Sequence, residues 1–274
     1  MMFNDVSEHN ILVLGGGKMG AAIINGWLKT GMEPQSICLL DTKPEVIESY
    51  RRKGIRAYQS VSEVPNNQLF TTFLLALKPQ IIIKSLHLFN DLINESTCLV
   101  SVAAGVTVSS LKSYLPNAKQ VVRVMPNTPA MIGKGVMVGF KSEGQEYLGT
   151  HIEGLFASLG SFHWVDDENL MHSVTAVSGS GPAYAFYFAE CFTACAKQLG
   201  LPDVLAKDLA LETLIGAAAL IEQSGQDVVD LRNKVTSPNG TTQAGLEVLM
   251  SNEVFAQTLL NCCEAARMRS VELS

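Results

Sequence analysis

A short apolar run that breaks directly into glycines constrains this fold more than any other part of the sequence. Residues 11–20 read Ile-Leu-Val-Leu-Gly-Gly-Gly-Lys-Met-Gly, and Gly15, Gly17 and Gly20 have the spacing G-x-G-x-x-G. In a strand–turn–helix unit the first glycine permits the tight turn, the second lets a pyrophosphate approach the backbone, and the third lets the helix pack closely on the strand. The pattern therefore predicts a dinucleotide site with its phosphates at a helix N-terminus. A turn with a purely structural role is the alternative.

The composition of the chain narrows the classes of partner. Of the 274 residues, 47% are hydrophobic and 17% are charged, which is enough apolar material for a sizeable core. The net charge of −6 argues against a nucleic-acid partner or an anionic membrane, because both attract clustered Lys and Arg. Residues 1–10 are largely polar and predict no signal peptide. No apolar run reaches the length of about 20 residues that a bilayer requires.

The six cysteines and five histidines follow no metal-binding or disulfide pattern. There is no C-x-x-C pair, and the histidines are scattered along the chain. We therefore expect no metal site, buried or inert thiols, and a reducing, cytoplasmic compartment. One reactive or regulatory thiol is the alternative.

The first half of the chain alternates apolar runs with helical patterns, which is typical of an α/β fold. The runs are continuously apolar, so we expect strands buried on both faces of a parallel, doubly wound, Rossmann-like sheet. The predicted strands are 10–14, 36–40, 70–76, 97–103 and 120–125, with helices at 18–30, 44–53 and 79–93. A further group of segments, 135–140, 143–159 and 161–165, is expected to close this domain over residues 1–166.

From residue 167 to 274 the sequence predicts helices only, at 168–176, 182–199, 202–223, 240–250 and 254–271. The run Leu209–Ile221 is apolar nearly all round, and a helix without a polar face must be covered on every side. A domain of this size cannot enclose that helix alone, so we interpret residues 167–274 as an all-α domain that forms a subunit interface. A self-contained bundle packed on the sheet is the alternative.

Asp41 ends the second predicted strand, 21 residues after Gly20, where an acid that binds the ribose 2′-hydroxyl of NADH would lie. Thr42 and Lys43 follow at once, and a lysine there suits the 2′-phosphate of NADPH. Asp41 could equally be a turn residue ahead of Pro44. This loop by itself leaves the choice of cofactor open.

Small residues, a lysine and an asparagine follow the other predicted strands, at the edge where open parallel sheets bind their ligands. Pro79 opens the helix behind Lys78, although Lys78 could also be a solvated loop residue. The candidate cofactor-binding residues are Gly15, Gly17, Lys18, Met19, Gly20, Asp41, Thr42, Lys43, Ala76, Leu77, Lys78, Pro79, Ala103, Ala104 and Asn127.

Two dense polar segments stand out in the second half. Residues 177–184, Val-Ser-Gly-Ser-Gly-Pro-Ala-Tyr, predict a small-residue loop ahead of a helix that is longer than a cap requires. Residues 236–242, Thr-Ser-Pro-Asn-Gly-Thr-Thr, combine several hydroxyls with the free N–H groups of a helix start. Such a start suits a small carboxylate.

With these segments in their order, the chain resembles the pyrroline-5-carboxylate reductases. The resemblance covers essentially the whole chain, and residues 236–242 are its most specific part. Asn239 departs from the glycine usual in that loop, and we expect it to tolerate the positive φ that the loop requires. Asp41 departs from the small or basic residues often found at its position. The matching segments are 15–20, 76–80, 101–106, 124–130, 178–184 and 236–242.

The resemblance implies hydride transfer from a nicotinamide to the imine carbon of L-1-pyrroline-5-carboxylate, which yields L-proline. It assigns Thr242 as the catalytic hydroxyl that binds the ring nitrogen, and Ser237, Gly240 and Thr241 as the carboxylate site. It also implies that NADPH is used and NADH tolerated, and that the chain forms a homodimer, with a decamer of five dimers possible. An imine carbon is already electrophilic, so no nucleophile or metal is needed.

Two other functions remain open from the sequence. A β-hydroxyacid dehydrogenase would need a catalytic lysine on an interdomain helix, and neither Lys197 nor Lys207 has the expected surroundings. A non-catalytic nucleotide-binding regulator would leave residues 236–242 unexplained.

Overall fold

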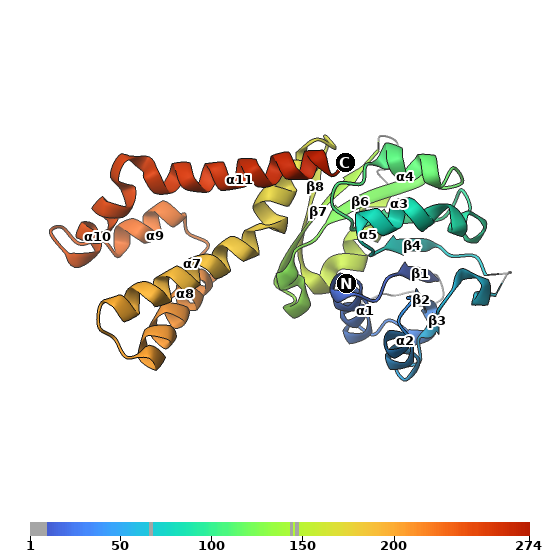
Figure 1. Ribbon diagram of the computed structural model, residues 1–274, viewed down its shortest axis with the longest axis horizontal. Helices are drawn as coiled ribbons and strands as arrows, with labels where there is room; N and C mark the ends of the chain where they lie inside the picture. The colour runs from blue at the N-terminus through green and yellow to red at the C-terminus, as the bar shows by residue number, and fades with distance from the viewer. Residues whose placement is uncertain (1–9, 66–67, 143–144, 146–147) are drawn as a thin grey trace. The chain divides into compact units, whose positions relative to one another are not determined.

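The computed structural model describes residues 10–65, 68–142, 145 and 148–274, which form two compact units (Figure 1). The first unit runs to Ser180 and also includes Ala266–Ser274, whereas the second is Gly181–Ala265. The composition of the sequence changes near Asp166, but the first unit continues beyond that point because the Gly179 backbone lies against Met125. Each unit is described by itself.

The first unit is built on an eight-stranded sheet with strand order β3-β2-β1-β4-β5-β6-β7-β8. The strands from β3 to β6 are parallel, and their carboxyl ends therefore meet at one edge of the sheet. Their bounds are β1 Ile11–Leu14, β2 Ile37–Leu40, β3 Arg56–Tyr58, β4 Thr72–Leu75, β5 Cys98–Ser101, β6 Gln120–Met125, β7 Gly135–Lys141 and β8 Gly160–Val165.

The five strands predicted to be parallel are parallel, whereas β7, for which the sequence indicated no direction, runs antiparallel to β6. Residues 126–134 join the two strands and hold only the short 3-10 turn η5, Thr128–Ile132. A parallel crossover needs a dozen or more residues, so this connection returns the chain in the opposite direction. The helix α5, Leu148–Phe156, then makes β8 parallel to β7. Of the helix predicted over 143–159, residues 143–144 and 146–147 lie outside the described ranges.

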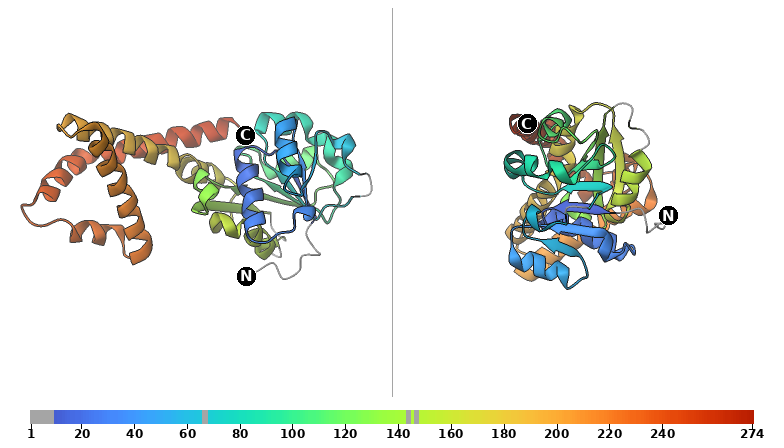
Figure 2. Two further views of the ribbon diagram at one scale, coloured as in Figure 1. Left: turned by 90° about the horizontal axis from the view of Figure 1, so that it is seen from below. Right: turned by 90° about the vertical axis from the view of Figure 1, so that its right-hand side faces the viewer.

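Helices pack on both faces of the sheet, as the doubly wound prediction requires (Figure 2). Alternate residues of β1 point to opposite faces: Ile11 and Val13 belong to one buried apolar cluster, and Leu12 and Leu14 to the other. Apolar side chains of α1, α2 and α5 join the first cluster, whereas those of α3 and α4 join the second. The bounds are α1 Lys18–Lys29, α2 Pro44–Arg51, α3 Pro79–Ser85 and α4 Val108–Tyr114.

Several short elements differ from their prediction. The sequence analysis missed β3, α4 and the later helix α9, Val228–Lys234, which are only three to seven residues long. The helix predicted over 79–93 divides into α3 and the 3-10 segment η4, Leu86–Leu92. The loop predicted at 177–184 is wrong, because α6, Leu170–Val174, continues through the π-helical turn η7, Thr175–Gly179, into α7, Gly181–Gln198. The N–H of Ser180 donates to the Thr175 carbonyl at 2.8 Å, which closes this wider turn.

The second unit is entirely helical. It contains α7, α8 Asp203–Ser224, α9 and α10 Thr241–Met250. It also contains the part of α11, Val254–Glu272, that precedes residue 266. Ala206 and Ala210 are the only buried residues of Gly181–Ala265, a range that the structure describes in full. The unit therefore has almost no core within a single chain, which contradicts a self-contained bundle. Its exposed apolar side chains include Phe186, Tyr187, Phe192, Leu209, Ile215 and Leu220.

The last turns of α11 belong to the first unit. Ser270 is 5% exposed, and its hydroxyl lies 3.0 Å from Nδ1 of His172. Gly105 has a φ of +77°, and a Cβ there would lie 3.0 Å from the Leu273 carbonyl oxygen. Burial, together with the nearby Arg123 guanidinium, lowers the pKa of His172, so its neutral form is favoured in this contact. No helix in the described part of the chain is long and apolar enough to cross a membrane.

Candidate active site

The predicted glycine turn has the geometry that a dinucleotide requires. Gly15 has a φ of +102°, and its N–H donates to the Leu40 carbonyl at 2.8 Å. A Cβ on Gly20 would lie 2.0 Å from the Gly15 carbonyl oxygen, so only glycine fits there. In contrast, a Cβ on Gly17 would meet no atom within 4 Å. Gly17 is the N-cap of α1 and makes no side-chain cap bond, which leaves an open approach to the first N–H groups of the helix.

Asp41 is held in place by two backbone groups. Its Oδ2 accepts the N–H of Gly16 at 2.8 Å, and its Oδ1 accepts the N–H of Lys43 at 2.9 Å. The carboxylate thus joins the glycine turn to the loop after β2. Lys43 is the N-cap of α2, and its side chain is exposed. The sequence predicted a site role for Asp41 but gave no sign of the Gly16 contact.

The other predicted cofactor residues lie at the carboxyl edge of the parallel strands. The N–H of Ala76 donates to the Leu14 carbonyl at 2.9 Å, which places the end of β4 beside the glycine turn. The Leu77 side chain packs over that turn, since a Cβ on Gly15 would lie 2.7 Å from its Cδ2. Lys78 is exposed at the start of α3, directly before Pro79.

The small residues after β5 leave room at the same edge. Ala103 is 8% exposed and Ala104 is half-buried. Two of the predicted residues direct their side chains elsewhere: Met19 packs against the first apolar cluster, and Lys18 lines a groove along α1.

Asn127, which follows β6, is fixed by two polar contacts. Its Oδ1 accepts the N–H of Val136 at 2.9 Å, and its Nδ2 lies 3.4 Å from Oγ of Ser178 in the π-helical turn. Asn127 is 9% exposed, so these contacts satisfy an otherwise buried amide. The segment 177–184 thus supports the loop after β6, which is a role that the sequence did not indicate.

A partly buried ion pair lies at the end of β6, between Arg123 and Glu168. Nη1 of Arg123, a residue that is 3% exposed, lies 2.8 Å from Oε1 of Glu168, and the same oxygen accepts the N–H of Val108 at 2.7 Å. The sequence analysis did not predict this pair. An arginine inside an otherwise apolar strand was the available signal, because buried charges require partners.

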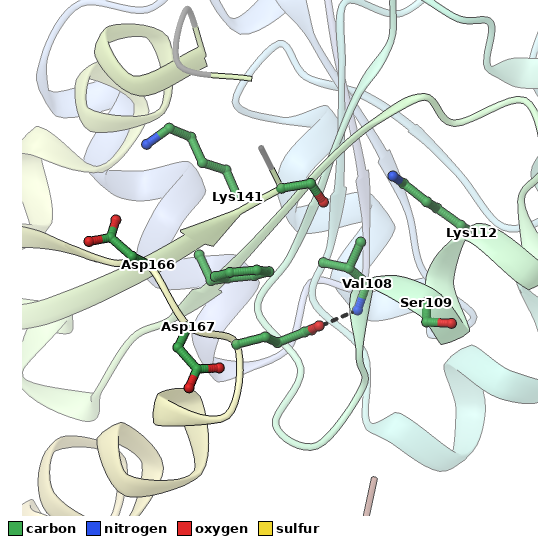
Figure 3. Close-up of a pocket in the computed structure, with 9 residues that line it drawn as sticks. Val108, Ser109, Lys112, Lys141, Asp166 and Asp167 are labelled. Carbon is green, nitrogen blue, oxygen red and sulfur yellow. Dashed lines mark hydrogen bonds between the residues drawn. The ribbon is translucent and has the colours of Figure 1, made fainter. Parts of the chain in front are cut away.

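Beyond the ion pair lies an open hollow of about 790 Å³, which Figure 3 shows. Lys112, Lys141, Asp166 and Asp167 surround it, but their charged ends do not converge on one point. The hollow thus presents two basic and three acidic side chains, a mixture that complements neither an anion nor a cation. In the described part of the chain no group of three or more His, Cys, Asp or Glu side chains could hold a metal ion.

The cysteines do not form a cluster either. All six are free, and burial raises the pKa of Cys38 and of Cys98 to about 12, so neither forms a thiolate at neutral pH. The other four are not buried: Cys195 and Cys262 are exposed, and Cys191 and Cys263 are half-buried.

The predicted substrate residues lie in the second unit, at the start of α10. Gly240 is the N-cap and makes no side-chain cap bond, so the first N–H groups of a ten-residue helix stay free. A Cβ on Gly240 would lie 2.6 Å from Oγ of Ser237, which keeps that hydroxyl close to the helix start. Thr241 and Thr242 are exposed in the first turn. This combination of free donors and hydroxyls suits a carboxylate.

Asn239 adopts a φ of +60°, as expected from the sequence. Its N–H donates to Oε1 of Gln243 at 2.8 Å, and the Gly240 N–H donates to the Ser237 carbonyl at 3.0 Å. The loop therefore keeps a compact path with asparagine in place of glycine.

Two family models match the chain. Residues 168–273 match the model described as pyrroline-5-carboxylate reductase dimerisation, and residues 10–105 match that described as NADP oxidoreductase, coenzyme F420-dependent. The pyrroline-5-carboxylate reductase of Haemophilus influenzae is 33% identical over 97% of this chain and 98% of its own. That of Glycine max is 34% identical over 95% of this chain and 94% of its own.

Solved structures give the same result. A pyrroline-5-carboxylate reductase from Coxiella burnetii matches with a TM-score of 0.89 and 32% identity, over 97% of this chain and 98% of its own. The Plasmodium falciparum enzyme, solved with NADP bound, matches with a TM-score of 0.79 and 26% identity over the same shares of the two chains.

Proposed function

This chain belongs to the pyrroline-5-carboxylate reductase family, and we propose that it reduces L-1-pyrroline-5-carboxylate to L-proline. When bound, the reduced nicotinamide supplies the hydride that adds to the imine carbon of the ring. The observation that carries the proposal is the joint presence of the open glycine turn at Gly17 and the uncapped start of α10 at Gly240. A regulator that only binds nucleotides would need the first of these alone.

Different residues at the start of α10 bind different parts of the substrate. The free N–H groups of the first turn, which begins at Thr241, hold the substrate carboxylate at the positive end of the α10 dipole, with the Ser237 hydroxyl close by at Gly240. The Thr242 hydroxyl, next along the helix, forms a hydrogen bond with the ring nitrogen. Since the imine carbon is already electrophilic, catalysis depends on positioning and on this hydrogen bond.

An assay of cofactor oxidation tests the reaction. We expect turnover of L-1-pyrroline-5-carboxylate with formation of proline, and none with 3-hydroxyisobutyrate and the oxidised cofactor. Turnover of the hydroxy acid alone would assign the chain to the β-hydroxyacid dehydrogenases instead.

Removing the Thr242 hydroxyl should slow the reaction without unfolding the protein. Thr242 is exposed, so Thr242→Val should lower kcat by at least about ten-fold, because one hydrogen bond to the reacting group is lost. Thr258→Val is the matched control, since the Thr258 hydroxyl donates to the Val254 carbonyl of its own helix. Equal kcat values for the two variants would exclude Thr242 from the catalytic step.

The contacts of Asp41 bear on the choice between NADH and NADPH. The sequence and its family resemblance favour NADPH with NADH tolerated. However, both carboxylate oxygens accept backbone N–H bonds, so the charge is held in place rather than free to turn aside. A fixed carboxylate accepts a bond from a ribose 2′-hydroxyl and repels a 2′-phosphate, by up to about 4 kcal/mol per charge at surface-like dielectric. We propose that Asp41 shifts this chain towards NADH, and that Lys43 offsets part of the repulsion.

Asp41→Asn removes the charge and keeps the side-chain shape. We expect it to raise the ratio of kcat/KM for NADPH to that for NADH by at least about ten-fold, whereas Lys43→Ala should lower this ratio. Asp91→Asn, an exposed change on η4, is the control and should leave the ratio unchanged. A ratio that stays constant in both loop variants would show that neither side chain reads the 2′ position.

We further propose that the chain acts as a homodimer through its helical unit. The description of the family model that matches residues 168–273 names dimerisation. The exposed apolar side chains of Gly181–Ala265 support a subunit interface on this helical unit. The family resemblance extends this to a decamer of five dimers.

A further inference from the structure

An open groove of about 680 Å³ runs along α1. Its other wall is formed by η5 and by the 3-10 segment η6, Ala157–Leu159. Its floor is largely apolar and includes Ala21, Leu28, Ala130 and Met131. Neither the proposed reaction nor the proposed subunit interface uses this groove.

Three lysines lie along the groove, and no Asp or Glu is among its lining residues in the described chain. Lys18 and Lys29 stand at opposite ends of α1, about 16 Å apart along the helix axis. Lys53 reaches across from the end of α2, where its Nζ donates to Oδ1 of Asn25 at 2.9 Å and lies 4.9 Å from the centre of the Tyr50 ring. The positive charges are thus spread over an apolar floor.

Three further features mark the groove as incomplete. Among the described residues, neither Lys18 nor Lys29 has an ion-pair partner. Met131 is 57% exposed, although it is a large apolar side chain. In addition, Oγ of Ser158, at the floor beside Gly26, is buried without a hydrogen-bond partner. Buried hydroxyls ordinarily have a partner, and this one reorients by rotation about a single bond.

We propose that this groove binds a small anionic amphiphile, a molecule with a carboxylate or phosphate head on an apolar body. The ammonium groups complement the head, and lysine binds such anions as a point charge. The alanine, leucine and methionine floor removes the apolar body from water. The groove volume lies within the range of about 300–1,000 Å³ that is usual for small-molecule sites.

Calorimetric titration of the full-length protein at low salt tests the proposal. The probes are octyl phosphate and octanoate, with octyl glucoside and octyltrimethylammonium as neutral and cationic controls of the same chain length. We expect the two anions to bind and the controls to bind at least about ten-fold more weakly. A difference in affinity between octyl phosphate and octanoate identifies which anionic head group the lysines prefer.

The double variant Lys29→Gln/Lys53→Gln should weaken anion binding at least about ten-fold, because it removes two of the charges. Both residues are exposed, so the fold should be unaffected. The matched control Lys84→Gln/Lys112→Gln removes two exposed lysines that do not line the groove and should bind as the wild type. Three results would each overturn the proposal. The two double variants could bind the anions with equal affinity, octyl glucoside could bind the wild type as tightly as the anions do, or neither anion could bind at millimolar concentration.

Discussion

Gly20→Ala should abolish cofactor binding and destabilise the fold, whereas Gly17→Ala should abolish cofactor binding alone. The two residues stand three positions apart in the same turn, yet their surroundings differ. The new Cβ at Gly20 would lie 2.0 Å from the backbone oxygen of Gly15 and 3.3 Å from Cβ of Ala76. No side-chain rotation relieves a clash with backbone. The turn must therefore open, and the free energy of unfolding should fall by about 3 kcal/mol.

At Gly17 the φ of −66° suits any residue, and no atom lies within 4 Å of the new Cβ. The free energy of unfolding should therefore change by less than about 0.5 kcal/mol. The methyl group would nevertheless occupy the space through which a pyrophosphate approaches the helix start. We expect cofactor affinity to fall by at least about 100-fold, since phosphate contacts are lost together.

Urea denaturation and a fluorescence titration with the reduced cofactor separate the two effects. The Gly20 variant should shift both measurements, and the Gly17 variant only the second. If Gly17→Ala binds the cofactor like the wild type, the pyrophosphate does not approach this turn, and the assignment of the dinucleotide site fails.

Ile215→Glu should separate the subunits and remove activity. Ile215 is 69% exposed on α8 in the single chain, within a unit whose only buried residues are Ala206 and Ala210. If α8 is covered by a second copy, the substitution places an unpaired carboxylate in an apolar interface, which costs several kcal/mol. A two-fold symmetric dimer would contain two such carboxylates, so the cost applies twice. The dimer should therefore dissociate at micromolar concentration, and the helical unit should lose its folded structure with it.

Leu69→Glu is the matched control, because Leu69 is similarly exposed, at 66%, but belongs to the first unit. Light scattering and activity should be measured on the same samples. The wild type and the control should give at least the mass of a dimer with full activity. An active wild-type species at the chain mass of 29.6 kDa would contradict the interface altogether.

Local requirements explain what the sequence predicted well. Gly20 is dictated by its contact with Gly15 in the same turn, Gly15 by its positive φ, and the positive φ of Asn239 follows from the loop around it. The direction of β7 depends on the length of a connection whose helical or turn character the sequence leaves ambiguous. β3 is three residues long and carries too short a pattern to detect.

Tertiary contacts explain what the sequence missed. The serines and glycines of residues 177–184 favour a loop by local preference, yet they continue a helix because Ser178 and Gly179 pack against Asn127 and Met125. The acid at position 41 was visible in the sequence, but its bond to Gly16 joins residues 25 positions apart. Such pairs depend on how strands are placed in the sheet, which no short window of sequence reports.

The return of α11 to the first unit has a consequence for synthesis of the chain. Domains generally fold from the N-terminus as they leave the ribosome. Here residues 266–274 are translated after the whole of Gly181–Ala265, yet they complete a unit that began with β1. The nascent chain therefore carries an unfinished first unit until residues 266–274 have left the ribosome, and by then the apolar helices of Gly181–Ala265 have already emerged. Closure of the first unit and the first opportunity for two subunits to pair thus fall close together in time.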